Sequence, residues 1–266
     1  MVETNDRRLP VGIQSFEEIR REGYLYVDKT DIIWQLANRV KRYTYFCRPR
    51  RFGKSVLVDT LEAYFLGKKE LFEGLKIMDL ETEWVKRPVI RLDMSRAGAE
   101  SKSVRSYLDN VFHTYETEYG IVMHQDSSLA VRFSNIIQTA CKQTGQQVAI
   151  LIDEYDSPLQ HSWKTPEHEA CTSIYREVFA ILKADDKYEK FVFITGITKF
   201  TQLSLFSGFN NLSIISLDPE YAAICGITKE EVLRDFKPEI SKLATKNDWT
   251  FDEAVAQLTA YYDGYH

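Results

Sequence analysis

The chain has 266 residues, of which 44% are hydrophobic and 13% aromatic, and a net charge of −5. This length suits one large α/β domain, alone or with a small satellite, and the composition is that of a globular protein with a packed core. The negative net charge provides no overall attraction to nucleic acid, although local basic patches remain compatible with it.

Three absences narrow the class of protein further. The four cysteines are far apart and form no Cys-x-x-Cys pair, which argues against a zinc ribbon or a disulfide framework and favours a reducing compartment. The N-terminus lacks the apolar core of a signal peptide, and no apolar run approaches the roughly 18 residues of a membrane span. We therefore expect a cytoplasmic protein without a membrane partner.

Residues 1–40 predict a helical lead-in that packs on a larger core. Ser15, followed by two acidic residues, is typical of a helix start, and Gly23 of a helix end. A short extended piece should follow at Tyr24–Val27. Asp28 or Thr30 would then cap a second helix, whose apolar residues recur at helical spacing.

The next stretch contains the first motif with chemical content. A strand at Tyr43–Cys47 is followed by Gly53-Lys54-Ser55 and then by a helix over Lys54–Leu66. Such a junction can bind phosphate through backbone N–H groups and the helix N-terminus, while the lysine reaches the outer phosphates and the serine holds Mg²⁺. The expected nucleotide-binding residues are Arg48, Pro49, Arg50, Arg51, Phe52, Gly53, Lys54, Ser55 and Val56.

The arginines of this loop allow several interpretations. Arg48 stands where the usual phosphate-loop pattern has glycine, and Pro49 beside it would stiffen the backbone. We expect one of Arg48, Arg50 and Arg51 to contact phosphate, because a guanidinium matches phosphate geometry. The alternatives are plain surface charge and contact with nucleic-acid phosphates.

Further along the chain, Pro88–Met94 predicts a second strand, and the apolar pattern predicts three helices at Ser103–Glu118, Leu129–Gln143 and Glu167–Leu182. Strands are expected at Phe191–Gly196 and Leu212–Leu217. From Thr228 onward the pattern is helical, with Glu230–Phe236 and Phe251–Tyr262 as the clearest segments.

The second motif is the apolar run Val148–Ile152 followed by Asp153 and Glu154. A short apolar run between turn signals indicates a strand buried on both faces, and ligands bind at the carboxyl edge of such sheets. There Asp153 could orient Mg²⁺ or its bound water, and Glu154 could take a proton from an attacking water. The plain alternative is a solvated turn, but the upstream Gly53-Lys54-Ser55 favours a nucleotide site.

Thr195 ends the fourth predicted strand. If that strand lies between the phosphate-loop strand and the Asp153 strand, the threonine would point at the terminal phosphate or the attacking water. Otherwise it simply begins a turn with Gly196. Lys199 could touch phosphate but more often would be a solvated lysine, and Asp156 could extend the acidic site but more often would cap a turn.

The order of elements predicts an α/β fold with a parallel sheet of about five strands and helices on both faces. We divide it into the lead-in (1–40), a nucleotide-binding core (41–220) and a C-terminal helical lid (221–266). The five histidines show no metal-ligand spacing.

The motifs together resemble the predicted AAA-ATPase-like family of bacterial proteins, which is similar to archaeal-type and signal-transducing P-loop ATPases. The resemblance spans nearly the whole chain and is carried by Leu9-Pro10-Val11-Gly12, Tyr24-Leu25-Tyr26-Val27-Asp28-Lys29-Thr30, Arg48-Pro49-Arg50-Arg51-Phe52-Gly53-Lys54-Ser55, Leu151-Ile152-Asp153-Glu154-Tyr155-Asp156, Phe193-Ile194-Thr195-Gly196-Ile197, Phe206-Ser207-Gly208-Phe209-Asn210-Asn211-Leu212 and Tyr262-Asp263-Gly264-Tyr265.

The resemblance implies a P-loop NTPase three-layer sandwich in which an extra strand separates the two nucleotide-motif strands. It makes Lys54 and Ser55 the phosphate and Mg²⁺ residues, Asp153 and Glu154 the metal and water-activating pair, and Thr195 a sensor. Family members often carry a further C-terminal domain that resembles restriction-type nucleases. This chain stops just after Tyr265, so we expect a fragment or a short member, for which nucleic acid would be a partner only through such a domain.

The main hypothesis is an ATP-binding module that hydrolyses ATP slowly with Mg²⁺, with an arginine donated by a neighbouring subunit or by the lid. A nucleotide-dependent switch with negligible hydrolysis is the main alternative, in which ATP orders the helices after Thr228 and changes a surface for a partner protein or a second copy. A small-molecule kinase is disfavoured because water activation by Glu154 would not serve it. A nuclease is disfavoured because the sequence shows no convincing acid-acid-x-Lys cluster.

Overall fold

The structure is a computed structural model, and it describes residues 8–39, 42–122, 127–197 and 212–262. The chain divides into two compact units, Met1–Cys225 and Gly226–His266. Among the described residues no helix is both long and apolar enough to cross a bilayer.

The larger unit is built on one parallel sheet. Its strands are β1 (Tyr43–Cys47), β2 (Val89–Asp93), β3 (Val148–Asp153), β4 (Glu189–Gly196) and β5 (Ser213–Ile214), in the order β2-β3-β4-β1-β5. All four strand pairs are parallel, so all strands end at the same edge of the sheet. The predicted α/β fold is confirmed, as is the expected position of one strand, β4, between β1 and β3.

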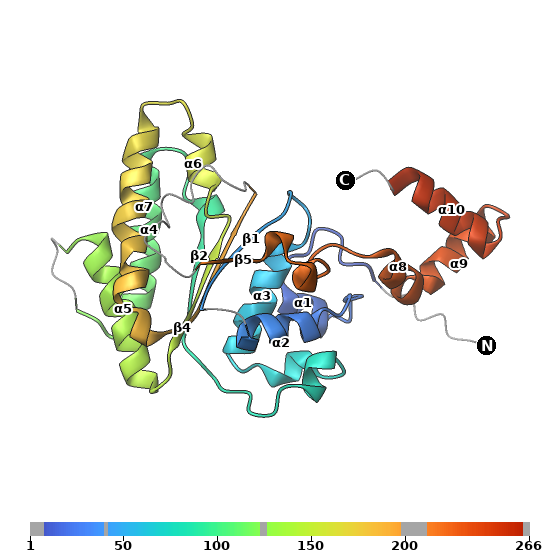
Figure 1. Ribbon diagram of the computed structural model, residues 1–266, viewed down its shortest axis with the longest axis horizontal. Coiled ribbons are helices and arrows are strands. Elements are labelled where there is room, and N and C mark those ends of the chain that lie inside the picture. Colours follow the sequence, from blue (N-terminus) through green and yellow to red (C-terminus); the bar gives the residue numbers. More distant parts are fainter. Residues whose placement is uncertain (1–7, 40–41, 123–126, 198–211, 263–266) are drawn as a thin grey trace. The chain divides into compact units, whose positions relative to one another are not determined.

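Helices cover both faces of the sheet, which makes three layers (Figure 1). The helices α1 (Phe16–Arg21), α2 (Thr30–Arg39) and α3 (Lys54–Phe65) lie on one face, and α4 (Ser101–Glu118), α5 (Leu129–Thr144) and α7 (Glu167–Ala184) on the other. A short helix, α6 (Ser157–His161), follows the end of β3 and was not predicted. The predicted helix bounds agree with the observed ones to within about two residues.

Each strand of the sheet centre supplies both cores alternately. In β3, Ile150 and Ile152 pack with α4, α5 and α7, whereas Ala149 and Leu151 pack with α1, α2 and α3. Every residue of β3 is buried. Burial on both faces explains why this segment is continuously apolar rather than alternating.

The N-terminal helices begin where their polar residues predict. The Ser15 side chain accepts a hydrogen bond from the N–H of Glu18 at the start of α1. At the start of α2, the N–H and hydroxyl of Thr30 both donate to Asp28, at 2.9 and 2.6 Å. These bonds satisfy donors that the first helical turn leaves without an intrahelical partner.

The edge strand β2 is protected by two tyrosines of α4. The N–H of Arg91 donates to the hydroxyl of Tyr115, and the N–H of Asp93 donates to that of Tyr107, each at 2.8 Å. An edge strand with unpaired N–H groups would be a template for association with other chains. In this sheet those donors are satisfied from the neighbouring helix.

The last strand is shorter than the predicted Leu212–Leu217. Pairing with β1 covers only Ser213–Ile214, and Ile215–Leu217 forms a 3-10 helix. Two hydrogen bonds to the end of β1 explain the difference: the hydroxyl of Ser216 accepts from the N–H of Cys47, and its carbonyl accepts from the side chain of Arg48. The chain therefore turns out of the sheet to meet the end of β1.

The smaller unit is helical, with α8 (Lys229–Asp235), α9 (Lys237–Lys246) and α10 (Phe251–Tyr262). Thr228 and Glu231 form a reciprocal capping box at the start of α8. The buried centre consists of Ile240, Ala244 and Ala254. The two predicted segments correspond to α8 and α10, and α9 lies between them in the sequence.

Glu189, at the start of β4, predicts a pH-dependent stability. It is fully buried, and desolvation raises its pKa to about 8 from an ordinary value of 4.5, although Tyr43 and Arg42 favour the charged form. Between these two values the unfolded chain is ionised while the folded chain holds the proton. This residue therefore makes the protein less stable as pH rises from about 4.5 to 8.

We expect Glu189→Gln to flatten that part of the stability profile and to stabilise the protein at pH 8. A difference of one pKa unit between the folded and unfolded chains corresponds to about 1.4 kcal/mol of unfolding free energy. Urea unfolding at pH 5 and pH 8 would therefore resolve the difference in stability between the variant and the wild type. The exposed Glu118→Gln on α4 is the control. An unchanged pH slope in Glu189→Gln would contradict the assignment.

Candidate functional site

Sheet topology brings the predicted motifs to one edge. The predicted phosphate loop, Arg48–Ser55, follows β1, Asp153 ends β3, and Thr195 lies near the end of β4 between them. In the register, Cys47 pairs with Gly196 and Ile152 with Ile194. The ends of the three strands are therefore level with one another, at the edge where open α/β sheets bind ligands.

The loop after β1 is shaped around Lys54. Its ammonium is buried and donates to the carbonyls of Arg48 and Pro49, both at 3.0 Å. Arg51 and Gly53 have left-handed backbones, with φ of 66° and 85°. Left-handed residues in a short loop curve the backbone so that successive N–H groups can face one anion.

The helix that follows the loop presents a suitable N-terminus. Its N-cap residue is Gly53, which offers no side-chain cap, and the first turn of α3 contains no acidic residue. The orphan N–H groups of this turn and the helix dipole both favour an anion there. Together with the buried Lys54, this N-terminus fits the phosphate groups of a nucleotide.

The other loop residues differ in their contacts and in their exposure to solvent. The guanidinium of Arg48 donates to the carbonyls of Cys47 and Ser216, at 3.0 and 2.6 Å, and lies over the Phe46 ring. Pro49, Arg50 and Arg51 are exposed. The remaining predicted loop residues, Phe52, Ser55 and Val56, are partly buried.

Thr195 connects the two acidic residues rather than facing solvent. Its buried hydroxyl donates to Oδ1 of Asp153 and accepts from the N–H of Glu154 at 3.1 Å. The same Oδ1 accepts from the Glu154 N–H, also at 3.1 Å. The end of β4 therefore fixes the turn that begins at Asp153.

Glu154 has an unusual backbone and a perturbed carboxyl group. Its φ is 47°, in the left-handed region that a residue with a side chain rarely adopts. Desolvation raises its pKa, as does the neighbouring Asp153, while Lys54 acts in the opposite direction. A carboxylate with a raised pKa is a stronger base than an ordinary glutamate.

A cavity of about 540 Å³ opens beside this turn. Ser55 from the start of α3 lines it together with Asp153 and Glu154 from the end of β3. The cavity thus brings together one residue of the phosphate loop and both acidic residues, although they lie far apart in the sequence. Gln14 and Ser15 of the N-terminal segment complete it on the α1 side.

The far wall of the cavity contains charged residues that sequence reasoning missed. Arg91 of β2 donates to Asp59 and Glu62 of α3, at 2.7 and 2.5 Å. Asp93, at the end of β2, pairs with Arg96 at 2.9 Å and is one of the charges that raise the pKa of Glu154. In the sequence, the only indication of these charges was Arg91 itself, because an arginine within the apolar run Val89–Leu92 requires a charged partner nearby.

Two further candidates have different outcomes. Asp156 accepts from the side chain of Gln160 and from the N–H of Ile197, at 2.7 and 2.9 Å, and so connects α6 to the end of β4. Lys199 lies outside the described residues.

Gly196 allows the end of β4 to approach the ring of Tyr155 closely, because a Cβ atom at this position would lie 2.7 Å from that ring.

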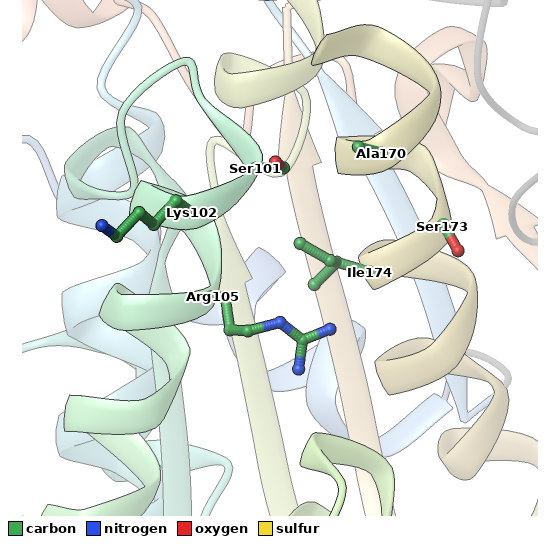
Figure 2. A pocket seen from close by; sticks show the side chains of 6 residues that line it. All are labelled: Ser101, Lys102, Arg105, Ala170, Ser173 and Ile174. Carbon is green, nitrogen blue, oxygen red and sulfur yellow. The ribbon is translucent and has the colours of Figure 1, made fainter.

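A second cavity, of about 380 Å³, lies between α4 and α7 (Figure 2). Its lining includes Lys102 and Arg105 from α4 and Ile174 from α7. Arg105 is paired with Glu177 at 3.5 Å. No residue predicted from the sequence to bind nucleotide lines this cavity.

The donor set at the main cavity suits Mg²⁺ that is shared with phosphate. Within the described ranges, no three His, Cys, Asp or Glu side chains form a group able to hold a metal by themselves. Mg²⁺ typically keeps several waters and takes only one or two protein ligands besides substrate phosphates. Ser55 and Asp153 fit that pattern, since both line the cavity at the phosphate loop.

Comparisons with known proteins give one family and two similar chains. Residues 10–206 match the family described as "Predicted AAA-ATPase". The chain is 34% identical over 264 residues to a protein of Azotobacter chroococcum mcd 1 named "Uncharacterized protein in vnfD 5'region". This match covers 98% of the chain and 49% of that relative, so the chain spans about half its length.

Among solved structures, a chain of "Structure of Drosophila ORC bound to GC-rich DNA and Cdc6" is similar at 9% identity, with a TM-score of 0.35. The match covers 93% of this chain and 77% of that one.

The Thr195 network predicts a specific loss of stability. Thr195→Val keeps the shape but leaves Asp153 and the Glu154 N–H without the hydroxyl, so we expect a loss of about 1–3 kcal/mol. Thr195→Ser should retain most of the stability. Urea unfolding measures both, with Thr114→Val on the exposed face of α4 as the control. Equal stability of Thr195→Val and the wild type would contradict the network.

Proposed function

The chain belongs to the predicted AAA-ATPase family, and we propose that it binds ATP with Mg²⁺ and hydrolyses it slowly. The single observation that carries this proposal is the shared cavity of Ser55, Asp153 and Glu154 at the end of the phosphate loop. The family supports a nucleotide-binding module of the ATPase type. The roles of the individual residues are our proposal.

Binding would rest on the phosphate loop. Lys54 is held at the centre of the loop by two carbonyls, so its ammonium is positioned before the nucleotide arrives. The N–H groups of the first turn of α3 add further donors. Arg50 is exposed and its charge partly opposes the rise in the pKa of Glu154, so we propose it as the loop arginine that contacts the outer phosphates.

Ser55 and Asp153 are the proposed metal residues. The hydroxyl of Ser55 would bind Mg²⁺ directly, and Asp153 would hold a water of its coordination shell. Both observed hydrogen bonds to Asp153 use Oδ1, so Oδ2 is the oxygen that we assign to this water. When bound, Mg²⁺ neutralises charge on the phosphates and so lowers the barrier to their displacement.

Glu154 is the proposed base. Its carboxylate would accept a proton from water as the water oxygen bonds to the γ-phosphorus and the bond to the β–γ bridging oxygen breaks. The products are ADP and inorganic phosphate. Thr195 would act as a positioning residue, because it holds both the Asp153 carboxylate and the Glu154 backbone. Its buried hydroxyl favours this role over direct sensing of the phosphate.

The proposal also includes a role for the helical unit and for a partner of the chain. The chain spans 49% of its curated relative, so a longer protein would have room for further activities and partners. We propose that α8–α10 serve as a lid and that a second copy or a partner protein supplies an arginine. A nucleotide-dependent switch remains the alternative function.

Two variants separate binding from turnover. We expect Lys54→Ala to reduce ATP affinity by at least about tenfold, because it removes the central cation of the loop. Glu154→Gln should retain affinity and lower turnover by about 10²-fold or more, since it removes only the base. Isothermal titration measures the affinity, and phosphate release with and without Mg²⁺ measures the turnover.

Matched controls are Lys183→Ala and Glu118→Gln, because both side chains are exposed and neither lines the cavity. Equal ATP affinity of Lys54→Ala and the wild type would contradict the binding role. If the wild type binds ATP but releases no phosphate, hydrolysis is wrong and the switch is favoured.

The raised pKa of Glu154 also predicts the acid limb of turnover. A base must be ionised, so turnover falls as pH drops through its pKa, and desolvation places this limb above the 4.5 of an ordinary glutamate. A pH profile of kcat/KM measures its midpoint, because kcat/KM reports the ionisation of the free enzyme. A limb at or below 4.5 would contradict the proposed base.

A further inference from the structure

The first residue of the phosphate loop is bound from three directions. The N–H of Arg48 donates to the carbonyl of Gly196 at 3.3 Å, and its own carbonyl accepts from Lys54 at 3.0 Å. Its guanidinium donates to the carbonyl of Ser216 at 2.6 Å. Arg48 thus connects the loop to the end of β4 and to the 3-10 turn that follows β5.

The orientation of the guanidinium matters for its role. It lies over the Phe46 ring, with Cζ 4.8 Å from the centroid, and its Nη1 is engaged by two backbone carbonyls. Hydrogen bonds from a charged donor are about twice as strong as neutral ones. The side chain is therefore directed toward β1 and the Ser216 turn, whereas Lys54 and the left-handed Gly53 shape the anion side of the loop.

Ser216 contributes a second bond to the same junction. Its hydroxyl accepts from the N–H of Cys47 at 2.9 Å, so two successive residues of the β1 end, Cys47 and Arg48, are bound to one residue. Ser216 is itself buried. Ser216 lies in the 3-10 turn that begins directly after the sheet pairing of β5 ends at Ile214.

We propose that Arg48 is a positioning residue, which fixes the phosphate loop to the Ser216 turn and does not contact nucleotide phosphate. Where the usual loop has a glycine, this chain has a cation that holds the loop from outside. The proposal rests on nucleotide binding at this loop. The structural part, the Arg48–Ser216 connection, exists without nucleotide and can be tested without it.

The experiment uses Arg48→Ala, Ser216→Ala and the double variant of the full chain. In free protein, we expect Arg48→Ala to speed amide hydrogen exchange of residues 213–221 by about tenfold, because a bond that holds the turn is lost. We also expect each single variant to weaken ATP and ADP binding alike. Arg48→Ala removes the bond to the Ser216 carbonyl, and Ser216→Ala removes the bond from the Cys47 N–H to the Ser216 hydroxyl. Because both bonds hold the same junction, the double variant should lose less affinity than the product of the two single losses.

Arg176→Ala, an exposed arginine of α7, is the control and should leave exchange and affinity unchanged. If Arg48→Ala does not fold, Arg48→Lys, which can make one bond to the Ser216 carbonyl, is measured instead and should show smaller shifts of the same kind.

Two results would overturn the inference: unchanged exchange at 213–221, or affinity losses that multiply in the double variant, as expected for a direct phosphate contact by Arg48. Failure of the proposed function would look different. The wild type would then bind no nucleotide, while the exchange measurement would still report on the Arg48–Ser216 connection.

Discussion

The proposed site depends on one constraint of the sheet: β4 lies between β1 and β3, and all three end at one edge. This order places Thr195 next to the turn of Asp153 and Glu154 on one side and next to Phe46, near the end of β1, on the other. The threonine hydroxyl then bridges the Asp153 carboxylate and the Glu154 N–H. Without this bridge, the left-handed backbone of Glu154 would have less to hold it.

The same edge concentrates polar groups that would be costly elsewhere. Lys54 and Asp153 are both buried, and each is satisfied by hydrogen bonds to backbone or side-chain groups nearby. A buried charge is tolerated only when it is paired or hydrogen-bonded. The fold therefore holds a cation and a carboxylate ready on two sides of one small region, which suits a ligand that carries both phosphate and a divalent cation.

Much of this could be predicted from the sequence, because strand ends and helix starts are local. The apolar run before Asp153 and the polar residues at Ser15 and Asp28 specify their elements directly. The left-handed backbone of Glu154 and the direction of the Arg48 side chain could not be predicted, because each depends on a residue that is distant in the sequence. Glu154 contacts Thr195, which is 41 positions away, and Arg48 contacts Ser216, which is 168 positions away. The same holds for the pairing of Arg91 with Asp59 and Glu62 in the lining of the cavity.

A structure of the chain with a non-hydrolysable ATP analogue and Mg²⁺ would test the central claim most directly. The proposed function predicts phosphates enclosed by the Arg48–Ser55 loop, with the terminal phosphate between Lys54 and Glu154 and the metal at Ser55. A nucleotide bound elsewhere, such as the cavity between α4 and α7, would contradict it. So would a metal distant from both Ser55 and Asp153.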